Sequence, residues 1–322
     1  MSDTNLVLSD APAIEGLRFR LYRGEEDIPA LEAVRREVQA VDGEIWMPGP
    51  DTVPNPACDP TRDCLIAEVA GRMVAYTWLT WWEETNGTLL YLHLGWVVPT
   101  WQRKGIGRAL LHWQEQRLRE IASANTGKGI PTFGGNADES QPANRALLLN
   151  EGYAVAFTVV KMLCELPAEP VEIAPMPEGL TLRPVEEAHL PAIYAANDSI
   201  FQESRHGYST DSYEEFLADA GWSPETKGLW LVAWDGNQIA GLVISKIEGG
   251  EGETPWVAVA RDWRRRGVAK ALLTLTLRTM QEQSIPRTRL LTVAENPNHS
   301  VRLYEGVGYH VTSRHPRYRK LM

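Results

Sequence analysis

The chain has 322 residues, of which 43% are hydrophobic and 23% are charged, and its formal net charge at pH 7 is −10. This length suggests about two domains of ordinary size, and no apolar run approaches the roughly 20 residues that cross a bilayer. The negative charge opposes the basic surface that binding to nucleic acid needs. We therefore expect neither a nucleic-acid nor a membrane partner. The negative charge would suit a cationic substrate.

The cysteines and the first residues bear on the cellular compartment. The chain has three cysteines, an odd number, and no two of them form a CxxC pair; they are Cys58, Cys64 and Cys164. This argues against a disulfide framework and against a zinc site. The first six residues have neither the basic start nor the apolar stretch of a secretory signal. We expect reduced thiols, no metal and a cytoplasmic location.

Short strands and amphipathic helices alternate along the first half of the chain. Apolar residues spaced for one helix face follow the first strand, and two strands around a glycine-containing turn form a hairpin. A fourth strand runs into a second glycine-containing segment, and a long helix follows it. These elements are the strand 17–22, the helix carrying Ile28, Leu31, Val34 and Val38, the hairpin 64–69 and 73–79, the strand 89–98, and the helix carrying Ala109, Leu110, Leu111, Trp113 and Leu118.

The second half of the chain repeats this order of elements. Residues 16–20 are matched by residues 179–183 at an offset of 163, and residues 101–111 are matched by residues 263–273 at an offset of 162. Several matches in one order at a nearly constant offset indicate an internal duplication. The repeated elements are the strand 180–185, the hairpin 229–234 and 239–244, the strand 256–259, and the helix carrying Ala271, Leu272, Leu275 and Leu277.

A segment rich in proline and acidic residues, 167–177, separates the two copies. This composition is typical of a stiff, exposed linker. We therefore predict a first domain of residues 1–166, a linker of residues 167–177 and a second domain of residues 178–322. Hairpins that precede a glycine turn and a helix predict a mixed α+β fold rather than a doubly wound parallel sheet.

In both copies a glycine-containing segment lies between a strand end and a helix start. Helix N-termini leave their first N–H groups unpaired and carry a partial positive charge, so a pyrophosphate binds there. For one copy alone a solvated basic helix start would be an alternative, but the duplication favours a binding site. Neither copy fits the nucleotide pattern GxxxxGK[ST] or the dinucleotide pattern GxGxxG. The predicted phosphate-binding residues are Gln102, Arg103, Lys104, Gly105, Ile106, Gly107 and Arg108 in the first copy and Arg264, Arg265, Arg266, Gly267, Val268, Ala269 and Lys270 in the second.

These segments resemble the acetyl-CoA pyrophosphate loop of the GNAT superfamily of N-acetyltransferases. Residues 294–309, with Asn296, the pair Leu303-Tyr304 and the pair Gly308-Tyr309, resemble a later signature of that family. The resemblance covers essentially the whole chain, and tandem members such as mycothiol synthase are similar in plan. It implies two tandem domains, each with a central, mostly antiparallel, splayed sheet flanked by helices. It further implies acetyl-CoA as co-substrate and direct acetyl transfer to a primary amine of a small molecule within a ternary complex.

The resemblance also implies roles for individual residues. Tyr304 matches the position of the acid that protonates the departing thiolate, with core packing as the alternative. The ends of the fourth strands would offer backbone N–H groups to the thioester and to pantetheine; the residues concerned are Val97, Val98, Val257 and Val259. Asn296 would contact the cofactor or fix the fifth strand, with a simple turn or helix cap as the alternative.

The general base is less well specified, because this superfamily often works through Glu, Asp or ordered water. Glu295 ends the predicted fifth strand, and Glu251 and Glu253 are the other candidates. We expect Glu295 to act as the base. His299 falls inside the predicted short helix, where a solvated surface histidine is the preferred interpretation.

The first copy departs from the family pattern at one position. Leu148 stands four residues before Gly152, where the second copy has Tyr304 before Gly308. We therefore expect the second domain to catalyse and the first to bind acyl-CoA or to serve a structural role. The alternatives are transfer of another acyl group, a protein amine as acceptor, or a non-catalytic acyl-CoA-binding regulator. For the oligomeric state we expect either a monomer or a homodimer.

Overall fold

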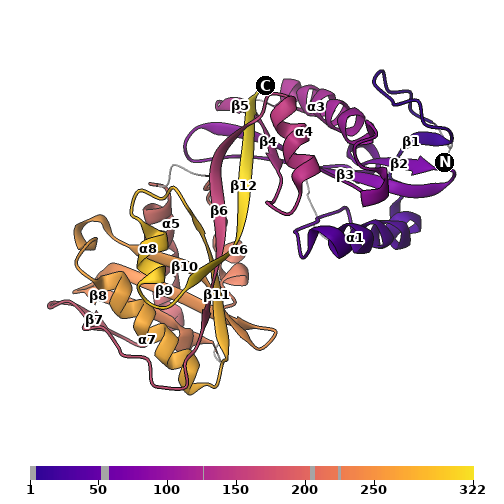
Figure 1. Ribbon diagram of the computed structural model, residues 1–322. Coiled ribbons are helices and arrows are strands. Elements are labelled where there is room, and N and C mark those ends of the chain that lie inside the picture. Colours follow the sequence, from indigo (N-terminus) through magenta and orange to yellow (C-terminus); the bar gives the residue numbers. More distant parts are fainter. Residues whose placement is uncertain (1–4, 52–57, 126, 204–206, 224–225) are drawn as a thin grey trace. The chain divides into compact units, whose positions relative to one another are not determined.

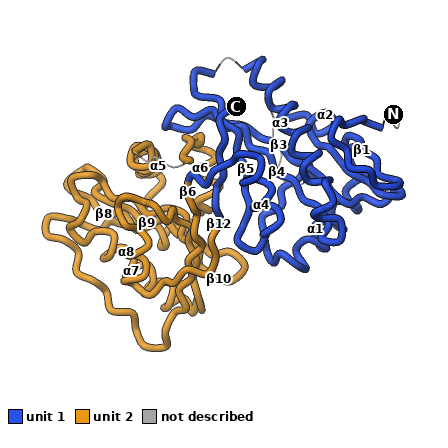
Figure 2. The backbone as a smooth tube through the Cα atoms, turned by 45° about the horizontal axis from the view of Figure 1, so that its top comes forward, with its two compact units in different colours: residues 1–156, 315–322 blue, residues 157–314 orange. Residues whose placement is uncertain are grey.

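The computed structural model describes residues 5–51, 58–125, 127–203, 207–223 and 226–322. The chain forms two compact units, residues 1–156 with 315–322 (unit 1) and residues 157–314 (unit 2) (Figure 2). Within the described ranges, no helix combines the length and the apolar character needed to cross a membrane.

Unit 1 is built on one sheet with the strand order β1-β2-β3-β4-β5-β12, and helices lie on both faces (Figure 1). All neighbours pair antiparallel except β4 and β5, which run parallel. Its elements are β1 (Leu17–Leu21), α1 (Ile28–Asp42), α2 (Pro60–Asp63), β2 (Leu65–Val69), β3 (Arg72–Glu83), β4 (Thr88–Val97), η2 (Pro99–Trp101), α3 (Ile106–Ala124), β5 (Ile130–Asn136), α4 (Pro142–Asn150) and the last part of β12 (His310–Leu321).

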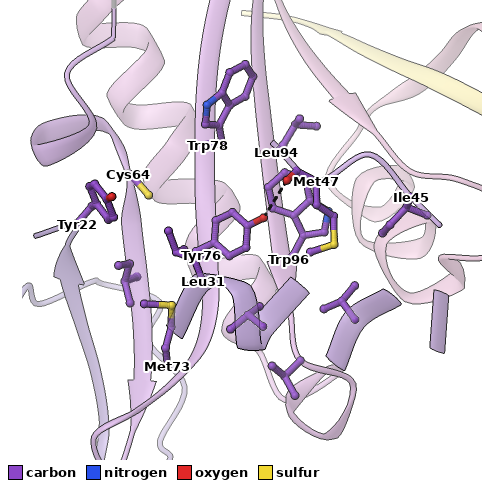
Figure 3. Close-up of a cluster of buried hydrophobic side chains, with 14 of the residues drawn as sticks. Tyr22, Leu31, Ile45, Met47, Cys64, Met73, Tyr76, Trp78, Leu94 and Trp96 are labelled. Carbon is purple, nitrogen blue, oxygen red and sulfur yellow. Dashed lines mark hydrogen bonds between the residues drawn. The ribbon is translucent and has the colours of Figure 1, made fainter. Parts of the chain in front are cut away.

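The apolar spacing of the sequence decides which helix faces are buried in unit 1. In α1 the residues Leu31, Val34 and Val38 are buried and pack with side chains from β2, β3 and β4 into one cluster (Figure 3). On the other side of the sheet, α3 packs its buried face against β1, β2 and β3. Because both sheet faces are covered, β3 and β4 are almost continuously buried rather than alternating.

Unit 2 repeats this arrangement with the strand order β6-β11-β10-β9-β8-β7. Helix α5 packs on one side of the sheet and α7 on the other. Its elements are β6 (Ala154–Glu165), β7 (Thr181–Leu182), α5 (Leu190–Phe201), α6 (Tyr213–Asp219), β8 (Trp230–Asp235), β9 (Gln238–Glu248), β10 (Glu251–Val259), η5 (Arg261–Trp263), α7 (Val268–Glu282), β11 (Arg287–Val293), α8 (Ser300–Glu305) and the first part of β12.

Each sheet is splayed between its two parallel strands. In unit 1 the pairing of β4 with β5 ends at Leu92 and Gly134, although β4 continues to Val97. In unit 2 only two residues of β10 pair with β11, and the register of β10 against β9 shifts between Glu253 and Trp256. The predicted mixed α+β fold with a splayed, mostly antiparallel sheet in each copy is therefore confirmed.

The compact units divide the chain elsewhere than at the predicted boundaries. Strand β6, which follows the last helix of the first copy, pairs through residues 159–165 with β11 in unit 2. Strand β12, which follows the last helix of the second copy, pairs through residues 317–321 with β5 in unit 1. Each unit thus takes a strand from the other sequence half. The two strands occupy equivalent places in the repeat, so the exchange leaves each sheet with a strand of the expected kind.

The segment predicted as a linker is fastened to α7 in unit 2. Ala174 N–H donates to Thr274 Oγ1 at 3.0 Å, and Val171 N–H donates to Gln281 Oε1 at 3.0 Å. The same Gln281 side chain donates to the carbonyl oxygen of Glu169 at 2.7 Å. Much of the segment is exposed, as its composition predicts, but its backbone follows the helix instead of bridging free space.

Candidate functional site

The predicted phosphate loop of unit 1 is a left-handed turn that opens directly into α3. Arg103 has φ of +59° and Gly105, the N-cap of α3, has φ of +92°. A positive φ is uncommon for a residue other than glycine, and no side chain caps the helix at Gly105. The first N–H groups of α3 therefore have no intrahelical partner, which is the arrangement that binds anions.

The loop of unit 2 has the same conformation, residue by residue. Arg265 has φ of +61° and Gly267, the N-cap of α7, has φ of +94°. The next residues, Ile106 and Val268, are both buried and fix the two helices to their sheets. The duplication therefore extends to the backbone geometry of the loop.

Two side-chain contacts are also shared by the loops. Gln102 Nε2 donates to the carbonyl oxygen of Val97 at 3.1 Å, and Arg264 Nε donates to that of Val259 at 3.0 Å. These two predicted site residues hold the loop to the end of its strand. The cation after each positive-φ arginine lies over a tryptophan ring: Lys104 is 4.3 Å from the Trp101 centroid and Arg266 is 5.0 Å from that of Trp263.

The flanking basic residues of the two loops differ in their partners. Arg108 forms an ion pair with Glu151 at 2.8 Å, whereas its counterpart Lys270 is exposed. Arg264 also pairs with Glu203 at 2.8 Å. Gly107 and Ala269 occupy the second position of their helices, where a small side chain leaves the amides accessible.

The ends of the fourth strands contribute backbone groups to each splay. Val98 N–H donates to Val74 within the sheet at 2.8 Å, so this predicted donor is not available to a ligand. Hydrogen-bonding direction alternates along an antiparallel strand, so the N–H of Val97 faces the splay. In unit 2, Ala260 N–H donates to Ala240 at 3.0 Å, and the same alternation turns the N–H groups of Val257 and Val259 toward β11.

A cavity of about 330 Å³ opens at the splay of unit 1. Its wall includes the phosphate loop, the end of β4, α4 and the last turn of α1. Gly135 on β5 lets Leu148 and His93 of the cavity wall pack close to the strand, because a Cβ there would lie 2.9 Å from Leu148 Cδ2 and 3.2 Å from His93 Cε1. The position that carries Tyr304 in unit 2 is thus an apolar wall residue, Leu148, in unit 1.

A buried polar network adjoins this cavity, and sequence reasoning missed it. His93 Nε2 lies 2.7 Å from the Tyr153 hydroxyl, which donates to Glu115 at 2.8 Å. Lys320 Nζ also donates to Glu115, at 2.7 Å. Burial lowers the pKa of His93 to about 4, so its ring is neutral at pH 7. Only the histidine inside an otherwise apolar strand, 89–98, could have drawn attention to this site.

Tyr304 in unit 2 lies on α8 with its ring packed edge-on to Tyr309, the centroids being 5.9 Å apart. It is buried in the core cluster between α7 and the sheet, and burial raises its pKa. No described residue hydrogen-bonds to its hydroxyl. A raised pKa keeps the phenol protonated, so it is available as a donor, but the packing also agrees with the alternative of a core tyrosine.

The carboxylates proposed as bases in unit 2 all have partners. Glu295 accepts a hydrogen bond from Thr158 N–H at 2.9 Å and so fixes the start of β6. Glu251 forms an ion pair with Arg287, and Glu253 pairs with Arg289 at 2.7 Å. The two pairs with arginine make Glu251 and Glu253 weaker proton acceptors than free carboxylates.

The remaining predicted residues form a turn before α8. Asn296 Oδ1 accepts a hydrogen bond from Asn298 N–H at 2.8 Å, which is the turn role considered as the alternative for Asn296. His299 is the N-cap of α8 with φ of +55°, rather than a residue inside the helix, and it is exposed. Among the described residues, no group of three or more His, Cys, Asp or Glu side chains is placed to hold a metal ion.

Comparison with known proteins identifies the family. The model of the acetyltransferase (GNAT) family matches residues 31–127 and 190–309, more than half of the chain. No curated protein sequence matches significantly.

Several solved structures have the same fold. A GCN5-related N-acetyltransferase from Sphaerobacter thermophilus has a TM-score of 0.74 and 24% identity, over 95% of this chain and 96% of that one. A tandem GNAT protein from the clavulanic acid biosynthesis pathway has a TM-score of 0.61 and 15% identity, over 94% and 98%. A glucosamine N-acetyltransferase region of a fungal multi-domain protein has a TM-score of 0.64 and 14% identity, over 97% of this chain and 39% of that one. With both family matches and both splayed sheets in place, the chain belongs to the GNAT family of acetyltransferases as a tandem, two-copy member.

Proposed function

We propose that this protein is an acetyl-CoA-dependent N-acetyltransferase that transfers the acetyl group to a primary amine of a small molecule. The observation that carries this proposal is the cavity of unit 1. It joins the phosphate loop at the start of α3 to the splay beside β4 and to the end of α1. One continuous space therefore reaches from an anion-binding helix N-terminus to a region that a second substrate can enter.

The residues of unit 1 fit acetyl-CoA. The uncapped amides at Gly105 and the cation of Arg103 would hold the pyrophosphate. The N–H of Val97 faces the splay, where it would pair with the pantetheine arm or with the thioester carbonyl. A Cβ at Gly135 would push against Leu148 and His93 on the wall of the cavity. The protein supplies a binding track and hydrogen-bond donors, and the reactive thioester comes with the co-substrate.

The reaction is direct transfer within a ternary complex. The amine nitrogen attacks the thioester carbon, the carbon–sulfur bond breaks, and the sulfur leaves with the bonding electron pair. The amine loses one proton and the thiolate gains one, so the products are an amide and free thiol. Donors aimed at the developing oxyanion lower the barrier, and the N–H groups along the splayed part of β4 would serve as such donors.

The two units support different steps of this proposal. The sequence favours unit 2 as the catalytic copy, through Tyr304 as the acid and Glu295 as the base. The geometry favours unit 1, because one cavity is lined by its phosphate loop, the end of β4 and the end of α1, whereas Glu295 in unit 2 is hydrogen-bonded to β6. We therefore propose unit 1 as the site of transfer and unit 2 as a second acetyl-CoA-binding copy, in which Tyr304 packs in the core.

A matched pair of variants tests these assignments. Gly107→Asp and Ala269→Asp place a carboxylate at the same helix position in the two loops. An acidic residue in the first helical turn does not destabilise a helix, but it repels a pyrophosphate. We expect calorimetry to find acetyl-CoA binding in wild type. In an assay of thiol release with a primary amine, we expect Gly107→Asp to lose activity and Ala269→Asp to keep it. Gly107→Ala and Ala269→Gly serve as size controls.

The other outcomes discriminate between the alternatives. Loss of turnover in Ala269→Asp alone would move the transfer site to unit 2. Acetyl-CoA binding without turnover of any amine would favour the non-catalytic acyl-CoA-binding alternative. Absence of acetyl-CoA binding in wild type would overturn the proposed function.

A further inference from the structure

We propose that Asp42 of unit 1 anchors a positively charged group of the acceptor, so that the acceptor is a diamine or a longer cationic amine. The inference rests on the proposed function, because it gives the amine acceptor a binding residue and a chemical class. Asp42 is the last residue of α1, is only 9% exposed, and lies on the wall of the cavity.

Asp42 is a buried carboxylate without a cation. Among the described residues, its carboxylate accepts one hydrogen bond, from the neutral amide Nε2 of Gln141 to Oδ2 at 3.4 Å. No Lys, Arg or His in the described part of the chain forms an ion pair with it. Burial, and then the charge of Asp138, raise the pKa of Asp42. A buried charge without a partner is costly, so a cationic ligand would relieve an unfavourable feature of the free protein.

The position of Asp42 at the end of α1 increases this effect. The C-terminus of a helix carries a partial negative charge, and the last turn of α1 holds no basic residue. The carboxylate and the helix end therefore act in the same direction. An ammonium group placed there would interact favourably with both.

The acidic neighbour of Asp42 has partners on β12 and is not among the residues that line the cavity. Asp138 pairs with His315 Nδ1 at 2.8 Å, and Arg317 also interacts electrostatically with Asp138. Arg317 does not pair with Asp42. The negative charge that faces the cavity at this end is thus mainly that of Asp42.

The adjacent walls suit the body of an amine. Val38, Leu94 and Trp96 line the cavity and belong to the apolar cluster under α1 (Figure 3). The tryptophan on the cavity wall offers a ring of the kind that attracts an organic cation. Asn136, also on the wall, has a buried Oδ1 that accepts no hydrogen bond from the described residues. Such an oxygen is satisfied by a ligand N–H.

Positive and negative side chains therefore lie on different walls of the cavity. The basic residues Arg103 and Arg108 lie on its wall at the phosphate loop, and Asp42 lies on the wall formed by α1. An anionic co-substrate and a cationic acceptor would each be drawn to its own part of the cavity. This separation of charge favours an acceptor that keeps a positive charge after its reacting amine has lost a proton.

Three acceptors of equal chain length test the inference. 1,4-Diaminobutane keeps a second cation, butylamine has none, and 4-aminobutyrate carries an anion in its place. With wild type we expect kcat/KM to be highest for the diamine, about tenfold above butylamine, and lowest for 4-aminobutyrate. A charge-assisted hydrogen bond accounts for a factor of this size.

Asp42→Asn keeps the shape and removes the charge. We expect it to lower kcat/KM for the diamine roughly tenfold or more, chiefly through KM, and to leave butylamine within about twofold. Glu44→Gln, an exposed charge change two residues away, is the matched control. An equal loss for the diamine and butylamine, or no loss for either, would overturn the role of Asp42.

Failure of the inference and failure of the proposed function are distinguishable. Turnover of amines without a preference for the diamine contradicts the inference alone. If no amine is acetylated, the proposed function fails, and thermal-shift titration with the diamine still tests Asp42. Stabilisation of wild type but not of Asp42→Asn would support the anchor, and equal behaviour of the two would refute it.

Discussion

Units 1 and 2 share the backbone conformation of their phosphate loops but differ inside the splay. The φ angles at Arg103 and Arg265, and at Gly105 and Gly267, agree within a few degrees. At an offset of 156, however, the residues Gly134 and Gly135 of β5 correspond to two leucines at 290 and 291 in β11. The backbone that binds an anion has been kept in both copies, while the side chains that shape the space beyond it have diverged.

The polar residues behind each splay differ in the same way. In unit 1, Tyr153 joins His93 to Glu115, and Glu115 is ionised. In unit 2 the matching Tyr309 lies beside the hydroxyls of Thr288 and Thr254 and the thiol of Cys164. Thr254 itself pairs with Ser245 at 2.9 Å. One copy therefore keeps a charged network next to a cavity, and the other keeps a neutral core. This contrast suggests that the two copies are under different functional constraints.

The largest effect is expected from giving position 135 of unit 1 the residue type found at the matching position of unit 2. In Gly135→Leu the new Cβ would lie 2.9 Å from Leu148, and the side chain would fill the cavity. We expect acetyl-CoA binding to unit 1 to weaken at least about 100-fold, with a loss of roughly 1–3 kcal/mol in stability from overpacking. Calorimetry, with circular dichroism as a check of folding, measures both.

The reciprocal variant completes this comparison. Residue Leu291 is 62% exposed, so Leu291→Gly opens no buried space and should leave acetyl-CoA binding unchanged. Unaltered binding to unit 1 in a folded Gly135→Leu variant would show that the cavity at the splay is not the co-substrate site.

The next effect concerns the pH dependence of stability, which His93 should give to unit 1 and not to unit 2. An unfolded histidine binds a proton near pH 6.5, but folded His93 does so only near pH 4. Between these values the unfolded chain holds more protons, so stability falls as the pH falls, by up to about 3 kcal/mol in total.

Urea unfolding at several pH values between about 7 and 4 measures this loss. The variant His93→Gln has no ring to protonate, so its stability should fall less over the same range. Equal slopes for wild type and His93→Gln would mean that the buried histidine is not neutral in the folded protein.

The sequence was informative where the backbone alone decides the structure. Glycine spacing indicates a turn with positive φ followed by a helix, and both loops have that form. Hydrophobic alternation located the hairpins and the long helices to within a few residues, although the strand 180–185 shortens to Thr181–Leu182. These features depend on neighbours in the chain, which a sequence displays.

Features that depend on tertiary contacts were not predictable in this way. No helix or strand pattern in the sequence singles out Asp42. Its proposed role depends on burial beside residues about 100 positions away in the chain. The exchange of β6 and β12 was hidden because the two strands follow equivalent helices of the repeat. Tyr304 matches a family motif, yet its burial against Tyr309 appears only once the core is assembled.

The smallest effect compares the two matching tyrosines directly. Removing the hydroxyl in Tyr153→Phe leaves both His93 and the charged Glu115 short of a buried partner, which should cost about 2 kcal/mol. The hydroxyl of Tyr309 is buried and makes no hydrogen bond of normal geometry with the described residues, so Tyr309→Phe should be neutral or slightly stabilising. Urea unfolding of the two variants measures the difference. Equal losses would mean that Tyr309 has a partner after all, and that unit 2 holds a polar network comparable to that of unit 1.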